Sequence, residues 1–143
     1  MTAAEWLTQI RAADDEILVL RRSMYDAWVN LTGSTPWLDG IGAQNSPDPH
    51  RFDGVAELDE AIHDRIRELS AMKAHAVRVI AQLPDPRQRQ VLTAYYVDCR
   101  REDGRKKTWE MVAVELNISW RQLMYARSGA LDAVEKFCDR IAH

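Results

Sequence analysis

The chain has 143 residues, of which 46% are hydrophobic and 29% are charged. This suits one globular domain, or a small domain with a helical extension. No run of about 18 apolar residues could span a membrane, and the first residues lack the basic-then-apolar order of a signal peptide, so we expect a cytoplasmic protein without membrane contact.

The net charge of −3 is unevenly distributed along the chain. Residues 1–83 carry eight basic and thirteen acidic side chains, whereas residues 84–143 carry eleven and nine. Binding to nucleic acid requires local positive charge rather than a basic whole protein. If the chain has a nucleic-acid site, we therefore expect it in the carboxy-terminal part.

The sequence shows no sign of catalysis. The histidines and the two cysteines, Cys99 and Cys138, lack metal-ligand spacing, and no nucleophile–base pair or phosphate-binding loop occurs. The carboxylates fall on the exposed faces of predicted helices. We expect a protein that is not an enzyme and has neither a metal nor a cofactor.

The first predicted element is a long helix over residues 3–31. Apolar residues recur at alternating steps of four and three, which is the seam of a helix that packs against another long helix. The seam consists of Trp6, Ile10, Ala13, Ile17, Leu20, Met24, Ala27 and Leu31.

Glycine and proline then interrupt residues 32–54, which predicts a long loop. A second long helix is predicted over residues 55–83, where Arg65 occupies one seam position and indicates a solvated or paired spot. The other seam residues are Leu58, Ile62, Leu69, Met72, Ala76, Val79 and Leu83. Residues 1–83 thus predict an antiparallel helical hairpin, and an intermolecular coiled coil fits the same pattern.

Leu83-Pro84-Asp85-Pro86 stops this helix and starts another over residues 86–98, because Asp85 can cap it with proline in its first turn. A polar stretch follows at residues 99–107. Its basic side chains are candidate phosphate contacts, with a solvated basic loop as the alternative. They are Arg100, Arg101, Arg105, Lys106 and Lys107.

Residues 108–134 predict two helices joined by a tight turn. Thr108 is a candidate N-cap, and Ala113 is a small residue where the helices cross. Asn117 tolerates the left-handed conformation of a turn, and Ser119 with Gln122 forms a capping box for the second helix. The pattern predicts a helix-turn-helix over residues 84–143, and a plain helical hairpin is the alternative.

The second of these helices carries long or planar side chains on the side opposite its apolar face. Arginine and glutamine can hydrogen-bond base edges, and tyrosine can hold phosphates. The candidate DNA-binding residues are Thr108, Ser119, Trp120, Arg121, Gln122, Met124, Tyr125, Arg127 and Ser128.

The run from Thr108 to Ala113, the turn Asn117-Ile-Ser119 and the pair Ala130-Leu131 resemble region 4 of sigma-70-type factors. The layout is similar to that of small phage late transcription regulators of the ArpU and RinA type. The resemblance implies an all-α protein in which a helical hairpin precedes a DNA-binding helix-turn-helix. Sigma factors commonly carry Arg and Glu where this chain has Trp120 and Arg121, so a standard −35 element is not the expected target.

We therefore expect a phage or prophage transcription regulator that binds double-stranded DNA with the helix starting at Ser119. The amino-terminal helices would form a homo-oligomer, and RNA polymerase is a further candidate partner. A DNA-packaging protein like a small terminase subunit is one alternative. A helical interaction module without nucleic acid is the other.

Overall fold

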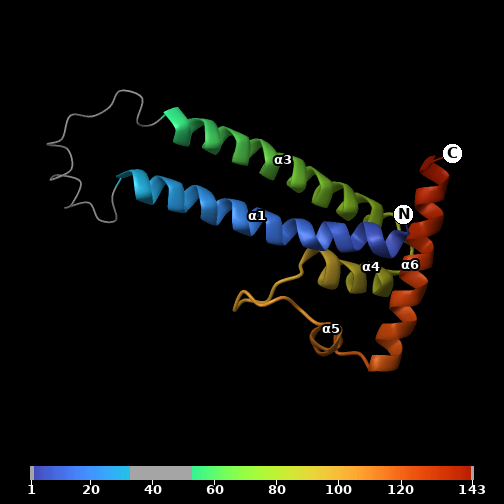
Figure 1. The fold of residues 1–143 in the computed structure, drawn as a ribbon. Coiled ribbons are helices and arrows are strands. Elements are labelled where there is room, and N and C mark those ends of the chain that lie inside the picture. The colour runs from blue at the N-terminus through green and yellow to red at the C-terminus, as the bar shows by residue number, and fades with distance from the viewer. Residues whose placement is uncertain (1, 33–52, 143) are drawn as a thin grey trace, which may run out of the picture. The chain divides into compact units, whose positions relative to one another are not determined.

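The computed structural model describes residues 2–32 and 53–142 of the chain. These residues form five α-helices, one π-helical segment and no strand, which confirms the all-helical fold class (Figure 1). The elements are α1 (Ala3–Thr32), α3 (Asp53–Ala81), α4 (Pro86–Leu92), η1 (Thr93–Val97), α5 (Trp109–Glu115) and α6 (Trp120–Ala142). No helix within these ranges is long and apolar enough to cross a membrane.

The chain divides into two compact units. Unit 1 comprises Met1–Asp14 and Ser70–His143, and unit 2 comprises Asp15–Leu69. Helices α1 and α3 each contribute to both units. Most of the loop predicted at residues 32–54 lies outside the described residues.

Unit 2 is a small helical pair whose seam buries Ile17, Ile62 and Leu69. The prediction for Leu58 is wrong, because its side chain is exposed rather than buried in the seam. At that level α1 meets α3 through a polar contact instead. The indole Nε1 of Trp28 donates to Asp59 Oδ1 at 3.4 Å, next to Leu58.

Arg65 is the seam position in unit 2 that is not apolar. Its Nε lies 2.9 Å from Glu16 Oε1 on α1, and its Nη1 lies 3.0 Å from Glu68 Oε2 one turn along α3. Of the two alternatives predicted for Arg65, a solvated or a paired position, the structure shows a paired one that remains partly exposed. The hydrogen bonds to these carboxylates raise the pKa of Arg65.

Unit 1 is built around a core to which α1, α3, α4, η1 and α6 all contribute. Leu7 is completely buried there, although it lies outside the predicted seam of α1. The seam pattern assumes one partner helix, whereas the first turns of α1 touch helices on two sides. The buried cluster consists of Ala3, Leu7, Val79, Ile80, Leu83, Leu92, Tyr96, Ala130 and Val134.

Helix α4 lies against α6, and its start follows the predicted pattern. The carboxylate of Asp85 accepts a hydrogen bond from the Arg87 backbone N–H, and Pro86 occupies the first turn. Gly129 of α6 allows close approach, because a Cβ atom there would lie 2.8 Å from Gln88 Nε2. The helix predicted over residues 86–98 is α-helical only to Leu92 and continues as the π-helical η1.

Candidate nucleic-acid interface

Two backbone hydrogen bonds close the turn between α5 and α6. The Ile118 N–H donates to Ala113 O at 3.0 Å, and the Asn117 N–H donates to Val114 O at 3.1 Å. These two bonds form a Schellman motif, which requires a left-handed residue after the helix end. Asn117 supplies it with a φ of 54°, as its residue type predicts. The direction in which α6 leaves α5 is therefore fixed by local geometry.

Helix α6 starts at once with a capping box, as the sequence predicts. The Gln122 N–H donates to Ser119 Oγ at 3.1 Å, and the Ser119 N–H donates to Gln122 Oε1 at 3.0 Å. The start of α5 is capped in a similar way, because Thr108 Oγ1 accepts from the Met111 N–H at 3.3 Å. The side-chain oxygens of Thr108 and Ser119 thus have structural roles.

A second apolar cluster within unit 1 holds α5 against α6. Ala113 is buried where the two helices meet, as predicted, and Ile118 of the turn packs against the same cluster. The cluster consists of Val91, Ala94, Val112, Ala113, Leu123 and Ala126. Because α4 and η1 contribute to it, the α5–α6 pair is anchored to the rest of the unit.

The opposite side of α6 is open to solvent over its first three turns. Arg121, Gln122 and Ser128 are exposed, and the Tyr125 side chain is 85% exposed. Trp120 is also exposed, at the first position of the helix. Met124 and Arg127 are half-buried on the flank of this surface. Of the residues selected from the sequence, Arg121, Gln122, Tyr125 and Ser128 thus lie on one accessible side of α6, whereas Thr108 precedes α5.

Arg127 belongs to a stack of four side chains that the sequence did not predict. Its Cζ lies 4.6 Å from the Trp109 ring centroid, and the Trp109 and Tyr95 rings stack at 3.6 Å with an interplanar angle of 11°. Arg11 of α1 lies over Tyr95, with its Cζ 4.0 Å from the centroid. Two cations thus flank two aromatic rings, an arrangement favoured by the negative potential of the ring faces.

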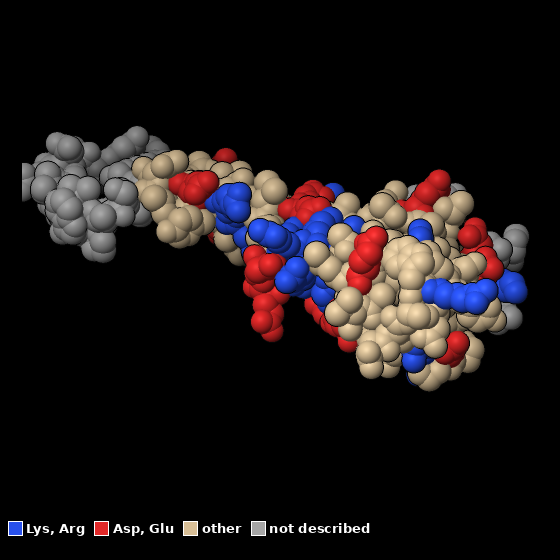
Figure 2. Space-filling view, turned by 90° about the horizontal axis from the view of Figure 1, so that it is seen from below, with Lys and Arg blue, Asp and Glu red and all other residues tan. Residues whose placement is uncertain are grey.

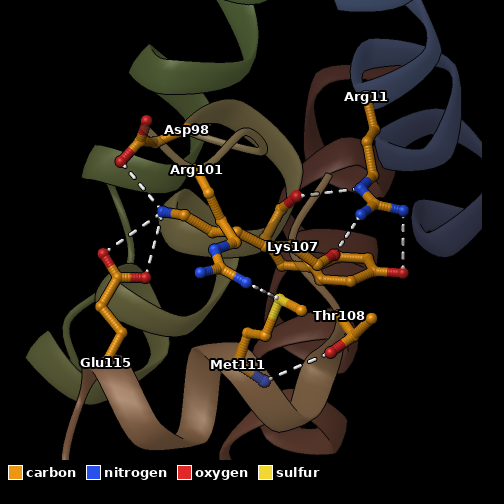
Figure 3. A network of polar contacts seen from close by, with 8 residues as sticks. Arg11, Asp98, Arg101, Lys107, Thr108, Met111 and Glu115 are labelled. Carbon is orange, nitrogen blue, oxygen red and sulfur yellow. Dashed lines mark hydrogen bonds and ion pairs between the residues drawn. The ribbon is translucent and has the colours of Figure 1, made fainter. Parts of the chain in front are cut away.

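Arg11 also ties α1 to the segment that leads into α5 (Figure 3). It donates to the Tyr95 backbone oxygen at 3.2 Å, to the Tyr95 hydroxyl at 3.1 Å and to the Lys107 backbone oxygen. This role of Arg11 is not predictable from the sequence, because 84 residues separate Arg11 from Tyr95. No local pattern at Arg11 distinguishes it from a surface arginine.

The basic stretch before α5 is a turn around Gly104, whose φ of 85° suits glycine. Arg101 and Arg105 are exposed and Lys106 is half-buried. The Arg100 guanidinium is held inside unit 1, where its Nε lies 2.5 Å from Asp14 Oδ2. Arg101 pairs with Asp103, with its Nη2 3.7 Å from Asp103 Oδ2. Arg105 is therefore the member of this stretch best placed for a phosphate.

Arg100 shares Asp14 with Lys73, whose Nζ lies 3.1 Å from Asp14 Oδ1. Burial by itself would raise the pKa of Asp14, but the hydrogen bonds from Arg100 and Lys73 outweigh it and lower the pKa. Asp14 is therefore ionised at neutral pH. The two cations neutralise it within unit 1.

The prediction that Lys107 contacts phosphate does not fit the structure. Its side chain is only 7% exposed, and its Nζ lies 3.1 Å from Asp98 Oδ2 and 3.0 Å from Glu115 Oε2 (Figure 3). Burial alone would lower the pKa of Lys107, but the hydrogen bonds to Glu115 and Asp98 raise it. The lysine charge is used to join the end of η1 to the end of α5.

Figure 2 shows the molecule from the α5 side. Lys and Arg side chains gather in one area of this face, interspersed with Asp and Glu, and a broad uncharged area lies beside them. The face is therefore not a continuous basic surface.

Comparisons of the chain with protein-family models, with curated proteins and with solved structures give no match. No group of three or more side chains suited to hold a metal ion occurs in the described part of the chain. The functional interpretation consequently depends on the geometry of α5, α6 and the turn between them.

Proposed function

We propose that the chain is a DNA-binding transcription regulator in which α5 and α6 form a helix-turn-helix. The observation that carries the proposal is the exposed face of Arg121, Gln122 and Tyr125, which begins directly after the Schellman turn and the capping box. In helix-turn-helix proteins the amino-terminal residues of the second helix contact base edges in the major groove. This face of α6 has the same location.

The side chains on this face have suitable chemistry. Arginine binds guanine O6 and N7 with two hydrogen bonds. Gln122 Oε1 accepts from the Ser119 N–H in the capping box, so its Nε2 is the donor that it offers to a base. Arg121 forms no ion pair within the described residues, so its donors are available to a ligand. Tyr125 lies one turn further along α6 and would reach the phosphate backbone or a thymine methyl group. Arg105 is the proposed phosphate contact before α5.

The resemblance to sigma region 4 and to phage late regulators supports this proposal. In the same proposal, α1 and α3 form an antiparallel hairpin that mediates homo-oligomerisation. RNA polymerase is a candidate partner of the regulator. The proposed role is binding and regulation rather than catalysis.

The test is fluorescence anisotropy of the full chain with labelled duplexes, first with a random pool and then with a site selected from it. Arg121→Ala should weaken the free energy of binding to the selected duplex by about 1–3 kcal/mol, and it should reduce the sequence preference at one base position. Arg78→Ala is the matched control, because Arg78 is an exposed arginine on α3 and is not part of the proposed DNA-binding face. Its affinity should equal that of the wild type.

The salt dependence gives a second measurement. With two or three phosphate contacts, the slope of log K against log salt should be about −2 to −3. Arg105→Ala should make that slope shallower by about one while leaving the sequence preference unchanged. The proposed function is refuted if the chain shows no salt-sensitive binding to any duplex. It is also refuted if Arg121→Ala and Arg78→Ala lower the affinity for the selected duplex equally.

A further inference from the structure

A hollow of about 800 Å³ opens beside α5 and the turn that precedes it. Met111 and Val114, one turn apart on α5, give it an apolar wall, and the Val114 side chain is 81% exposed. Met111 and Val114 thus give a partner a small apolar contact area on this side of α5. We refer to this surface as the α5 hollow.

The rim of the α5 hollow is acidic. Five carboxylates and three cations line it, and the cations are engaged inside the chain. Lys107 and Arg100 are held by the ion pairs described above, and Arg101 Nη2 lies 3.7 Å from Asp103 Oδ2. Glu102 and Glu110 form no ion pair or side-chain hydrogen bond with any described residue. The α5 hollow therefore suits a segment that carries arginine or lysine beside apolar side chains.

Such a segment lies on α1 of the same chain. Leu18, Arg21, Arg22 and Tyr25 are spaced at i, i+3, i+4 and i+7, so they share one face of the helix. All four are exposed, Leu18 by 44% and Tyr25 by 69%. Neither arginine forms an ion pair within the described ranges. We refer to these four residues as the α1 face.

We propose that the α1 face of one copy of this chain docks in the α5 hollow of a second copy. The two arginines lie opposite Glu102 and Glu110, and the two apolar side chains cover Val114 and Met111. The two helical turns from Leu18 to Tyr25 rise about 11 Å, so the four side chains form one short binding segment. An amphipathic helix in a groove is a common recognition mode, and the opposite charges set its orientation.

The contact joins two different surfaces. It therefore forms either a reciprocal dimer with two equal contacts, or a ring or filament in which each copy contacts the next. The exposed face of α6 is not part of it. Association through the α1 face is consequently independent of the proposed DNA binding and can be measured without DNA.

The experiment is sedimentation velocity of the full chain without DNA, from micromolar to millimolar concentration. One variant reverses the charge of the α5 hollow with Glu102→Lys and Glu110→Lys. Another reverses the charge of the α1 face with Arg21→Glu and Arg22→Glu. A third variant combines all four substitutions and restores the complementarity. Circular dichroism verifies that each variant keeps the helix content of the wild type.

We expect the wild type to associate, each two-residue variant to associate at least about tenfold more weakly, and the four-residue variant to recover. Val114→Ser tests the apolar part without altering charge and should also weaken association. Glu57→Lys with Arg78→Glu is the control, since both residues are exposed on α3 outside the two surfaces. A monomeric wild type overturns the proposal, as does association that neither reversal weakens or that the four-residue variant fails to restore.

Discussion

Asn117 offers a direct test of how the turn between α5 and α6 is held. Its φ of 54° places it in the left-handed region, where the side chain of an ordinary L-residue is crowded against the backbone. Glycine has no such crowding, alanine has it in full, and valine adds a branched side chain. Replacing Asn117 by each of these residues changes the backbone cost while leaving the apolar cluster in place.

The magnitude follows from the conformation. Asn117→Ala should lower the free energy of unfolding by about 1 kcal/mol, and Asn117→Val by about 2 kcal/mol. Asn117→Gly should stay within about 0.5 kcal/mol of the wild type, because the relief of crowding offsets the larger entropy of the unfolded chain. For a chain of this size, 1 kcal/mol corresponds to a shift in Tm of about 2–4 °C.

The measurement is urea unfolding monitored by circular dichroism, with thermal unfolding as a second probe. Gly104→Ala is a useful companion, because Gly104 also has a positive φ, of 85°, but nothing lies within 4 Å of an added Cβ atom. The loss of stability in Gly104→Ala should therefore reflect the backbone conformation alone. If the glycine variant of Asn117 is as unstable as the valine variant, the turn is not held by its left-handed residue.

Two further substitutions test packing and electrostatics within unit 1. Asp14→Asn removes the negative charge shared by Arg100 and Lys73. It should lower the free energy of unfolding by about 1–2 kcal/mol at neutral pH. Folding lowers the pKa of Asp14, so the carboxylate contributes its full stabilisation of the folded chain at pH values above its ordinary pKa. That stabilisation is lost as the pH falls through the pKa of Asp14 in the folded chain. Urea unfolding from pH 7 down to pH 3 should therefore show the wild type losing its advantage over the variant, and a constant difference would contradict this assignment. Gly129→Ala gains helix propensity, and the added Cβ displaces only the flexible amide end of Gln88, so the variant should be more stable by up to about 1 kcal/mol. A large loss in unfolding measurements would show that Gln88 cannot move.

The sequence alone determined the features whose partners lie within one helical turn. Thr108 with Met111 and Ser119 with Gln122 are caps between residues three apart, and Asn117 is fixed by its own backbone. Such interactions form in the same way in many tertiary contexts, so residue type and spacing predict them. The helical class and the exposed face after the turn follow from the same short-range patterns.

Tertiary structure decided the roles of side chains whose partners are distant in the chain. Leu7 is buried because helices meet α1 on two sides, and Arg11 reaches Tyr95 on η1. Lys107 lies in the middle of a basic stretch, yet the fold buries it between two carboxylates supplied by η1 and α5. Charge and periodicity describe what a side chain can do, but burial depends on which other elements approach it, and that is settled only when the whole unit packs.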